Sequence, residues 1–246
     1  MAQVLSASCV VVGNEILSGK TRDSNAHHLA RFLRTRGVDL QRIQVIPDVV
    51  ELIGSVVAEE SARSSVVFTS GGVGPTHDDV TYKGVARAFD LPVRRHHALA
   101  ARMEDFYGPR LTAVRLRMAD LPHPCELVHT DGMWVPVVLV RNVYVLPGIP
   151  SLFQSMLESL APRLQGTPIR LQSIYTQQGE SELAEHLEAT LAAHAGVEIG
   201  SYPRMNDPDH RVRVTLESRD ADLVTRATDW LLARLDPAKL VRVERD

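Results

Sequence analysis

The chain has 246 residues, of which 44% are apolar and 23% are charged, and its formal net charge is −3. This length and apolar content suit one large α/β domain, or one such domain with a smaller one attached. The nearly neutral charge gives no reason to expect a nucleic-acid partner.

The cysteines and the N-terminal segment exclude further classes of protein. Cys9 lies in an apolar run and Cys125 lies in a loop, without CxxC spacing, so neither a structural zinc site nor a disulfide framework is expected. No apolar stretch approaches the ~20 residues that span a bilayer, and the N-terminus lacks a secretory signal. We therefore expect a soluble cytoplasmic protein without a membrane partner.

The first half of the chain alternates short apolar runs with amphipathic segments. Ala7–Val12 predicts a buried parallel strand, and Asn25–Arg36 predicts a helix with apolar residues at helical spacing. The alternation continues with strands at Leu40–Ile46 and Ser65–Thr69, a helix at Val49–Ala62 opened by Asp48, and a helix from Asp79 to Phe89. Strands that alternate with helices predict a parallel sheet covered on both faces.

The middle of the chain is less regular. We expect a helix at Ala98–Tyr107 and a short helix or turn at Ala113–Ala119, followed by tightly joined strands at Trp134–Val140 and Asn142–Leu146. Pro150 can start the next helix, which runs to about Leu164, because proline is tolerated in the first turn of a helix.

After Gly166 the pattern changes and indicates a second domain. The expected elements are strand, helix, strand, strand, helix and strand, at Ile169–Thr176, Glu180–His194, Val197–Tyr202, Arg211–Ser218, Leu223–Leu235 and Leu240–Val243. This β-α-β-β-α-β order is that of a ferredoxin-like unit. We place the two domains at residues 1–166 and 167–246.

The strongest signal for a binding site is the run from Ser70 to Thr76, SGGVGPT, where a buried strand passes to a helix. Ligands in open α/β sheets lie at the carboxyl ends of the strands. Gly71, Gly72 and Gly74 lack Cβ atoms, so backbone N–H groups can approach an anion closely. The helix that follows adds the positive end of its dipole. The loop therefore predicts a phosphate site.

Asp78 and Asp79 follow this loop. Two carboxylates beside an anion site would repel the ligand unless a divalent cation joins carboxylate and phosphate oxygens. The alternative is that Thr76 and Asp79 form a capping box at the start of the helix. The two interpretations are compatible, because Asp79 can cap while Asp78 reaches the metal. His77 is a candidate ligand or general base, although a single loop histidine is more often neither.

Two more strand-to-helix turns fall on the same predicted edge of the sheet. Gly13, Asn14 and Glu15 follow the first strand, so Glu15 is expected to face the crevice of the glycine loop, with a solvated surface acid as the alternative. The run from Thr21 to Asn25, TRDSN, supplies more polar groups at a helix start than N-capping explains.

The third turn is LPGIP, which contains Pro147 and Gly148. A simple turn would account for it, and its position beside the other two turns is what suggests a pocket wall. The chain contains no GxxxxGK[ST], no GxGxxG and no GxSxG, so P-loop, Rossmann and α/β-hydrolase sites are excluded.

In these segments the chain resembles the molybdopterin-binding domains of the MoaB/MogA type: GGVGPTHDDVT at 71–81, VVGNEILSG at 11–19, TRDSN at 21–25 and LPGIP at 146–150. Within that family it is most similar to the CinA N-terminal domain and to the N-terminal domain of eukaryotic FAD synthases. The GPTHDD form, RNVYVLPGIP at 141–150 and GSYP at 200–203 favour this branch. The resemblance covers essentially the whole chain. It implies an α/β fold of three layers around a mainly parallel sheet, with a C-terminal βαββαβ subdomain.

The resemblance implies a metal-dependent pyrophosphatase that cleaves the diphosphate of FAD, ADP-ribose or a related dinucleotide. By position, Glu15, Asp78 and Asp79 would be catalytic and would hold the metal. The ligand would contact Gly13, Asn14, Thr21, Asn25, Ser70, Gly71, Gly72, Gly74, Pro75, Thr76, Pro147 and Gly148. Oxygen ligands suit Mg²⁺ or Mn²⁺, with Co²⁺ as an alternative and K⁺ as a further ion, and no tightly bound cofactor is expected.

Two departures from the family pattern bear on function. Asn14 stands where the FAD-synthase branch usually has Asp and the CinA branch has Thr, which assigns the shared role to Glu15. The chain ends at Asp246, without the CinA amidase domain or the FAD-synthase catalytic domain, so NMN deamidation and FMN adenylylation are not expected.

Two other functions stay open. One is a non-catalytic module that binds a dinucleotide or pterin, and the other is a molybdopterin adenylyltransferase of molybdenum-cofactor biosynthesis. The expected partner is a small nucleotide or pterin ligand, and the protein is expected to be a homo-oligomer. Arg204, next to GSYP, is either a phosphate contact or a surface arginine.

Overall fold

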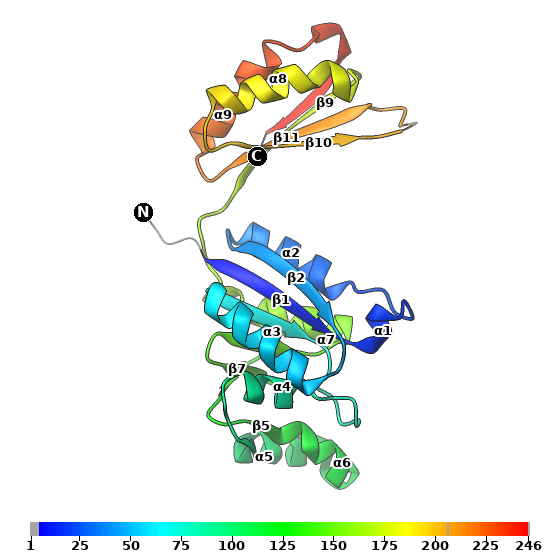
Figure 1. Cartoon of the computed structure of the whole chain (residues 1–246), viewed down its shortest axis with the longest axis vertical. Coiled ribbons are helices and arrows are strands. Elements are labelled where there is room, and N and C mark those ends of the chain that lie inside the picture. The colour runs from blue at the N-terminus through cyan, green and yellow to red at the C-terminus, as the bar shows by residue number, and fades with distance from the viewer. Residues whose placement is uncertain (1–4, 206, 246) are drawn as a thin grey trace. The chain divides into compact units, whose positions relative to one another are not determined.

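The computed structural model describes residues 5–205 and 207–245. The chain forms two compact units, unit 1 at Met1–Thr167 and unit 2 at Pro168–Asp246 (Figure 1). The boundary between the two units therefore lies one residue after the domain boundary placed from the sequence. Within the described ranges, no helix combines the length and the apolar character that crossing a bilayer requires.

Unit 1 is built around a six-stranded sheet with the strand order β2-β1-β3-β8-β7-β6. The strands are β1 Ser6–Val12, β2 Asp39–Ile46, β3 Val66–Ser70, β6 Glu126–Val128, β7 Val137–Val140 and β8 Val143–Leu146. β2, β1, β3 and β8 are parallel, whereas β7 and β6 pair antiparallel. Val11 pairs with Ser70, and Ser70 pairs with Leu146, so β1, β3 and β8 end at one edge of the sheet. We call this the carboxyl edge.

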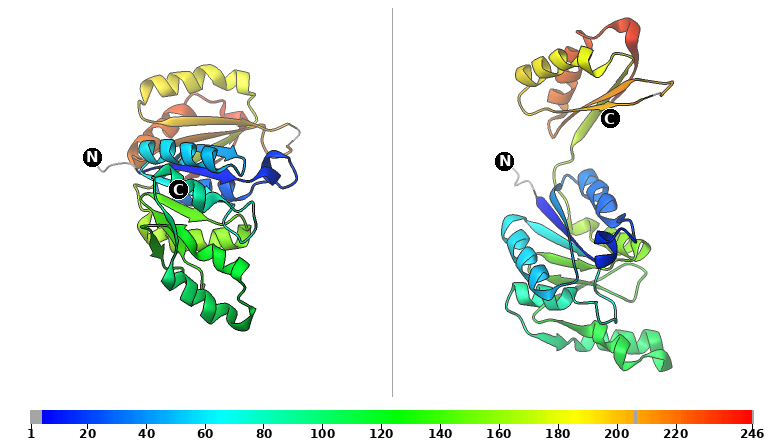
Figure 2. Two further views of the ribbon diagram at one scale, coloured as in Figure 1. Left: turned by 60° about the horizontal axis from the view of Figure 1, so that its bottom comes forward. Right: turned by 45° about the vertical axis from the view of Figure 1, so that its right-hand side comes forward.

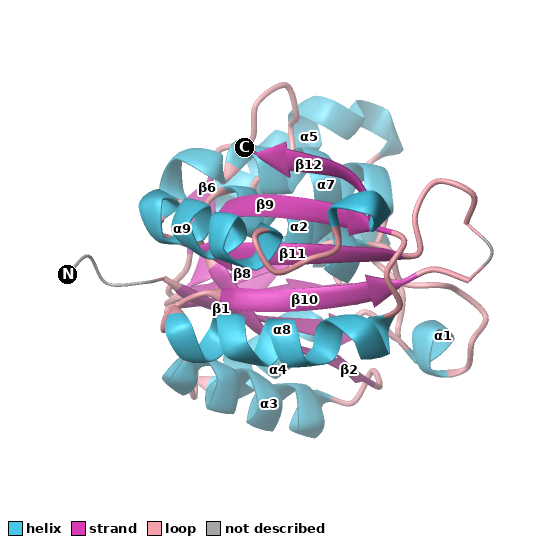
Figure 3. Ribbon diagram, turned by 90° about the horizontal axis from the view of Figure 1, so that it is seen from above, coloured by secondary structure: helices cyan, strands magenta, loops and turns pink. Residues whose placement is uncertain are grey.

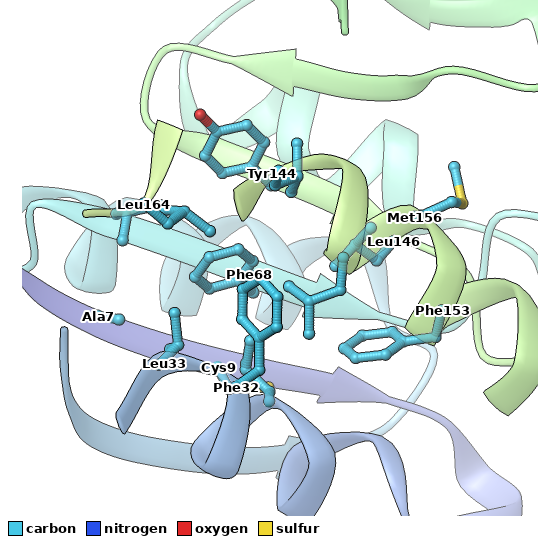
Figure 4. Close-up of a cluster of buried hydrophobic side chains, with 14 of the residues drawn as sticks. Ala7, Cys9, Phe32, Leu33, Phe68, Tyr144, Leu146, Phe153, Met156 and Leu164 are labelled. Carbon is cyan, nitrogen blue, oxygen red and sulfur yellow. The ribbon is translucent and has the colours of Figure 1, made fainter. Parts of the chain in front are cut away.

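Helices cover both faces of this sheet (Figures 1 and 2). α2 Asn25–Thr35 and α7 Pro150–Ser159 pack on one face, where Leu33, Phe68 and Phe153 are fully buried (Figure 4). α3 Val50–Arg63, α4 Thr81–Ala88 and α5 His97–Tyr107 pack on the other face, around Ile53 and Met103. The predicted three-layer α/β class is confirmed.

The central strands are buried on both faces, as their unbroken apolar runs predict. Every residue from Ala7 to Val12 is at most 3% exposed. Burial raises the pKa of the Cys9 thiol in this strand to about 12, with the nearby charge of Asp23 adding to the effect, so Cys9 stays protonated. Phe68 of β3 stacks on Tyr144 of β8 with ring centroids 5.6 Å apart, and both rings are drawn in Figure 4.

Several predictions about local structure were wrong or incomplete. The helix expected from Asp79 begins at Thr81, and the short helix or turn expected at Ala113–Ala119 consists of α6 Ala113–Leu116 and a 3₁₀ helix at Arg117–Ala119. The helix expected to reach Leu164 ends at Ser159. The sequence did not predict the short helix α1 Asn14–Leu17 or the short strands β4 Val93–Arg95, β5 Asp120–Pro122 and β6. Three or four residues carry too little hydrophobic periodicity to indicate an element.

Unit 2 has the predicted βαββαβ order. Its elements are β9 Arg170–Thr176, α8 Glu180–Ala193, β10 Glu198–Pro203, β11 Val212–Ser218, α9 Ala221–Leu232 and β12 Leu240–Arg245. The four strands form an antiparallel sheet in the order β10-β11-β9-β12, and both helices lie on one face of it (Figure 3). Ile174, Leu183 and Leu231 are fully buried between the helices and the sheet.

Two glycines allow α3 and α4 to pack closely, and they differ in what an added Cβ would meet. At Gly84 of α4 the Cβ would overlap the fully buried Ile53 side chain, whereas at Gly54 of α3 it would lie 3.1 Å from the flexible Arg87 side chain. We expect Gly84→Ala to lower the free energy of unfolding by about 1–3 kcal/mol, because the helices must separate. Gly54→Ala is the matched control. We expect it to leave the free energy of unfolding unchanged or to raise it by about 1 kcal/mol at most, because alanine has a higher helix propensity than glycine.

Urea denaturation followed by tryptophan fluorescence measures both changes. The chain has two tryptophans, Trp134 in unit 1 and Trp230 in unit 2, so a Trp230→Phe background makes the signal report unit 1. Equal effects of the two substitutions would contradict close packing at Gly84.

Candidate functional site

Asn25 joins two loops at the carboxyl edge of the sheet. Its side-chain amide nitrogen donates a hydrogen bond to Ser70 Oγ and another to the Gly148 carbonyl, both at 2.9 Å. The side chain is placed by the start of α2, where the Asp23 carboxylate accepts hydrogen bonds from the backbone N–H groups of Asn25 and Ala26. Asn25 is 3% exposed, so these bonds are made away from water.

A small hollow of about 70 Å³ lies beside Asn25. Predicted site residues from all three turns line it, namely Glu15, Thr21, Asn25, Ser70, Gly71 and Gly148. The Oδ1 atom of Asn25 is buried and has no hydrogen-bond partner among the described residues. The sheet register thus brings together residues that are up to 133 positions apart, from Glu15 to Gly148.

Gly71 and Gly72 shape the turn after β3. Gly71 has φ +103° and Gly72 has φ +64°, in the region that favours glycine. A Cβ on Gly71 would overlap the Val12 carbonyl oxygen of the neighbouring strand. The N–H of Gly71 donates to the Leu146 carbonyl at 3.1 Å, so Gly71 contributes its conformation and not a donor to a ligand.

The N–H groups that follow are uncommitted. Among the described residues, no backbone hydrogen bond is donated by Gly72, Val73 or Gly74. The carbonyl oxygens of Gly71 and Gly72 instead accept hydrogen bonds from the Thr81 hydroxyl at 2.8 Å and the Thr81 N–H at 2.9 Å, which fix the loop to the start of α4. Three free donors on a fixed loop are the arrangement that an anion requires.

The Thr76 hydroxyl lies within hydrogen-bond distance of both aspartates of this loop. Its Oγ1 lies 2.5 Å from Asp78 Oδ1 and 2.5 Å from Asp79 Oδ2. The Thr76 N–H also donates to Asp79 Oδ2 at 2.8 Å. Because a hydroxyl has one proton, it can donate to one carboxylate at a time. Two negative charges are therefore held against one oxygen atom.

The Thr76 hydroxyl also affects ionisation at this point. Its hydrogen bond to Asp78, followed by a backbone hydrogen bond and the nearby His77, holds the pKa of Asp78 below its ordinary value. Asp78 therefore stays ionised to lower pH than a free aspartate. The His77 side chain is 97% exposed and lies 3.8 Å from the Asp78 carboxylate, so it is placed as a surface residue.

The capping alternative for Asp79 is wrong. α4 starts at Thr81, its N-cap is Val80, and no side chain caps it. The bond between Asp79 and the Thr76 N–H closes a turn that precedes the helix instead. Asp48 likewise does not open α3, whose N-cap is Val49. The Asp48 carboxylate accepts a hydrogen bond from the Asn14 N–H at 2.8 Å.

Glu15 lies in α1, and its side chain folds back over Gly13. A Cβ built on Gly13 would lie 2.5 Å from Glu15 Oε1, at the end of a flexible side chain that can move aside. Glu15 does not form a group with Asp78 and Asp79 whose donor atoms all lie within 4.8 Å of one another. The predicted catalytic residues therefore form two groups: Glu15 in the hollow, and the aspartates on the glycine loop.

The remaining predicted contacts are spread around these groups. Asn14 and Thr21 are exposed, and Thr21 N–H donates to the Glu15 carbonyl at 3.1 Å. Pro75 is half-buried in the glycine loop, whereas Pro147 is buried beneath the neighbouring turn. A Cβ on Gly148 would lie 3.4 Å from Gly71 Cα, so the two turns are in contact.

A second group of acidic residues lies in unit 2. Asp207, Asp209 and His210 offer donor atoms within 4.8 Å of one another. Arg204 pairs with Asp207 at 2.9 Å, and Arg242 pairs with Asp209 at 2.5 Å. A backbone hydrogen bond from Asp209 and then Arg204 lower the pKa of Asp207, and Arg242 and then His210 lower that of Asp209. The paired arginines already neutralise these carboxylates, so the group does not favour a cation. Arg204 is thus an ion-paired surface arginine.

Residues 8–166 match the family model of the probable molybdopterin binding domain. The chain belongs to this family. Residues 168–244 match a second family model, that of the FAD synthase middle domain. The resemblance predicted from the sequence is confirmed.

Individual members of this family show the same relationship. The chain is 32% identical to a probable FAD synthase of Caenorhabditis briggsae, over 88% of this chain and 47% of that protein. It therefore spans about half the length of the FAD synthases it matches. It is 35% identical to a protein of Pyrococcus horikoshii, over 80% of this chain and 84% of that protein. A crystal structure of a CinA protein of unknown function from Thermoplasma acidophilum covers 65% of this chain and 98% of that one, with 32% identity and a TM-score of 0.60.

We expect Asn25→Asp to loosen the carboxyl edge. The change removes the two amide donors and buries a carboxylate beside the Gly148 carbonyl, which should lower the free energy of unfolding by about 1–3 kcal/mol. Burial raises the pKa of the new carboxyl group, and its neutral form can still donate one hydrogen bond. The loss should therefore be small at about pH 4 and grow as the pH rises to about 7.

Urea denaturation at both pH values, in the Trp230→Phe background, measures this loss. Asn14→Asp is the matched control, because it makes the same change at an exposed position of α1. A loss that does not depend on pH, or one equal to that of the control, would contradict the role given to Asn25.

We also expect Thr76→Val to raise the pKa of Asp78 toward its ordinary value. Valine has nearly the shape of threonine but lacks the hydroxyl that donates to Asp78 Oδ1. An NMR titration of the Asp78 carboxyl carbon measures the change. An unchanged pKa would mean that the backbone hydrogen bond and His77 lower the pKa of Asp78 without the Thr76 hydroxyl.

Proposed function

We propose that this protein is a divalent-metal-dependent nucleotide pyrophosphatase that cleaves the diphosphate of FAD, ADP-ribose or a related dinucleotide. The observation that carries the proposal is the convergence of Asp78 and Asp79 on Thr76 Oγ1, next to a loop with free backbone donors. One feature attracts a cation and the other attracts an anion. A metal-bound diphosphate satisfies both.

The donor set fits a hard divalent cation. Thr76, Asp78 and Asp79 present three oxygen atoms within a short span, and oxygen ligands suit Mg²⁺ and Mn²⁺. A cation there would relieve the repulsion between two carboxylates that share one hydroxyl proton. Such an ion supplies a lowered pKa for bound water and neutralises the charge of phosphoryl oxygens. The depressed pKa of Asp78 keeps this ligand ionised.

The remaining residues of the site bind and orient the substrate. The N–H groups of Gly72, Val73 and Gly74 would donate to non-bridging phosphate oxygens. Glu15, in the hollow beside the loop, would orient the attacking water. One oxygen–phosphorus bond forms as water attacks, and the bond from that phosphorus to the bridging oxygen breaks. The products are two monophosphates.

The family relationship supports a nucleotide or pterin ligand, and two other functions must be separated from the pyrophosphatase. A binding module would use the same free donors without turnover. A molybdopterin adenylyltransferase would need a nucleotide and a pterin together.

The test is chromatographic assay of the purified chain with FAD, ADP-ribose and NAD, each with Mg²⁺, Mn²⁺ or Co²⁺. We expect metal-dependent release of AMP, and we expect the double variant Asp78→Ala/Asp79→Ala to lose at least about a hundredfold in kcat/KM, as expected when charge stabilisation at the reacting phosphate is removed. Glu185→Ala/Glu188→Ala on α8 is the matched control, because it removes the same charge from exposed positions of unit 2.

The outcomes separate the three functions. Absence of turnover with every metal, combined with metal-dependent binding in calorimetry, would replace the pyrophosphatase with a binding module. Turnover that appears only when ATP and molybdopterin are both present would indicate the transferase.

A further inference from the structure

The hollow at the carboxyl edge is too small for a whole dinucleotide. Its volume is about 70 Å³. Pockets for ligands of that size measure roughly 300–1,000 Å³. The planar ring of a dinucleotide therefore needs a surface outside this hollow.

An exposed group of aromatic rings lies elsewhere in unit 1. Phe106 at the end of α5 stacks on Trp134, with ring centroids 4.7 Å apart and an interplanar angle of 18°. Tyr107 packs edge-on against both rings, at 5.0 and 5.4 Å. Phe106 is nevertheless 48% exposed, and Trp134 is half-buried. A large apolar surface is thus ordered by the protein and left open to water.

The sheet topology places this aromatic group at the carboxyl edge. Trp134 comes just before β7, which is antiparallel to β8, and Val138 pairs with Val145. β7 therefore begins at the edge where β8 ends. In the order β3-β8-β7, the glycine loop follows β3, Gly148 follows β8 and Trp134 precedes β7. β3 and β7 themselves lie two strand spacings, about 10 Å, apart.

The packing of the loop agrees with this placement. Val73 and Val80 of the glycine loop pack against the same buried cluster as Tyr107 and Trp134. Figures 1 and 2 show α5 leading to α6 on the side of unit 1 where β1 ends at α1. The free N–H groups and the rings thus lie on one side of the same unit.

Several other rings, which differ in exposure, are covered by arginine side chains, and Arg115 lies over Tyr107 of the aromatic group itself, 4.9 Å from the ring centroid. Arginine guanidinium carbons lie over Trp230 at 3.2 Å, Tyr175 at 3.6 Å and Tyr202 at 4.9 Å from the ring centroids. In the Phe106–Trp134 pair, each ring instead has the other as its stacked neighbour, and Phe106 keeps almost half of its surface free. A third planar ring can extend this stack.

We propose that the Phe106–Trp134 pair is the ring subsite of the pyrophosphate site. It would stack on the adenine or isoalloxazine ring of the dinucleotide whose phosphates bind the glycine loop, so the inference rests on the proposed function. Stacking tolerates any flat ring, because each presents a π-face. The substrate class is therefore set by a planar ring joined to a diphosphate, and not by hydrogen bonds to one base.

The test compares AMP with ribose 5-phosphate, which differ by the adenine ring and contain no diphosphate to cleave. In the Trp230→Phe background Trp134 is the remaining tryptophan. Excitation at the red edge of the indole band avoids absorption by adenine. We expect AMP to quench Trp134 and ribose 5-phosphate not to. Flavins are avoided in this experiment, because energy transfer to them acts without contact.

Phe106→Leu removes the ring but keeps apolar volume, and we expect it to weaken AMP binding about tenfold while leaving ribose 5-phosphate binding unchanged. Phe106→Tyr should restore binding. Val114→Ala is the matched control, because Val114 is equally exposed at 48% on the adjacent α6 but has no ring. In the hydrolysis assay, Phe106→Leu should raise KM for FAD and ADP-ribose and leave kcat nearly unchanged.

Equal quenching by both ligands, or AMP affinity that is unchanged in Phe106→Leu, would overturn the ring subsite even if the protein hydrolyses dinucleotides. Quenching by AMP that Phe106→Leu weakens, in a protein without turnover, would support the subsite and refute the pyrophosphatase.

Discussion

The side-chain amide of Asn25 makes two donated hydrogen bonds across the carboxyl edge, to Ser70 and to Gly148, and the site is arranged around them. These bonds tie the end of β3 and the turn after β8 to the start of α2. The glycine loop and the hollow therefore share one rigid boundary. Because the amide is buried, its donors find no water if either partner moves, so displacement of either loop is costly.

The glycines on this boundary have different structural roles, although the sequence does not distinguish them. Gly71 allows two strands to end in contact, since a Cβ would meet the Val12 carbonyl and its N–H is already bonded. The donors available to an anion come from the next three residues. Thr76 then holds two carboxylates immediately beyond those donors. Groups that attract a cation and groups that attract an anion thus lie side by side on one loop, and the proposed metal-bound phosphate rests on this arrangement.

In unit 2, by contrast, acidic side chains form ion pairs with basic ones. Asp207 and Asp209 are paired with arginines, and Lys239 pairs with Glu182 at 2.6 Å. Pairing of this kind leaves little net charge to attract an ion. In unit 1 the aspartates of the glycine loop face one hydroxyl and an exposed histidine instead. This contrast is why the proposed reaction is assigned to the edge of the six-stranded sheet and not to unit 2.

The sequence by itself determined the α/β class, the order of the longer elements in both units and the turns that meet at the carboxyl edge. These depend on hydrophobic periodicity and on glycines, which are local properties. The tertiary structure alone decided that Asp79 closes a turn, that Asp48 bonds Asn14, that Glu15 stands apart from the aspartates, and that Phe106 stacks on Trp134. Such contacts join residues from different strands and helices. They follow from strand order and register, which no local pattern encodes.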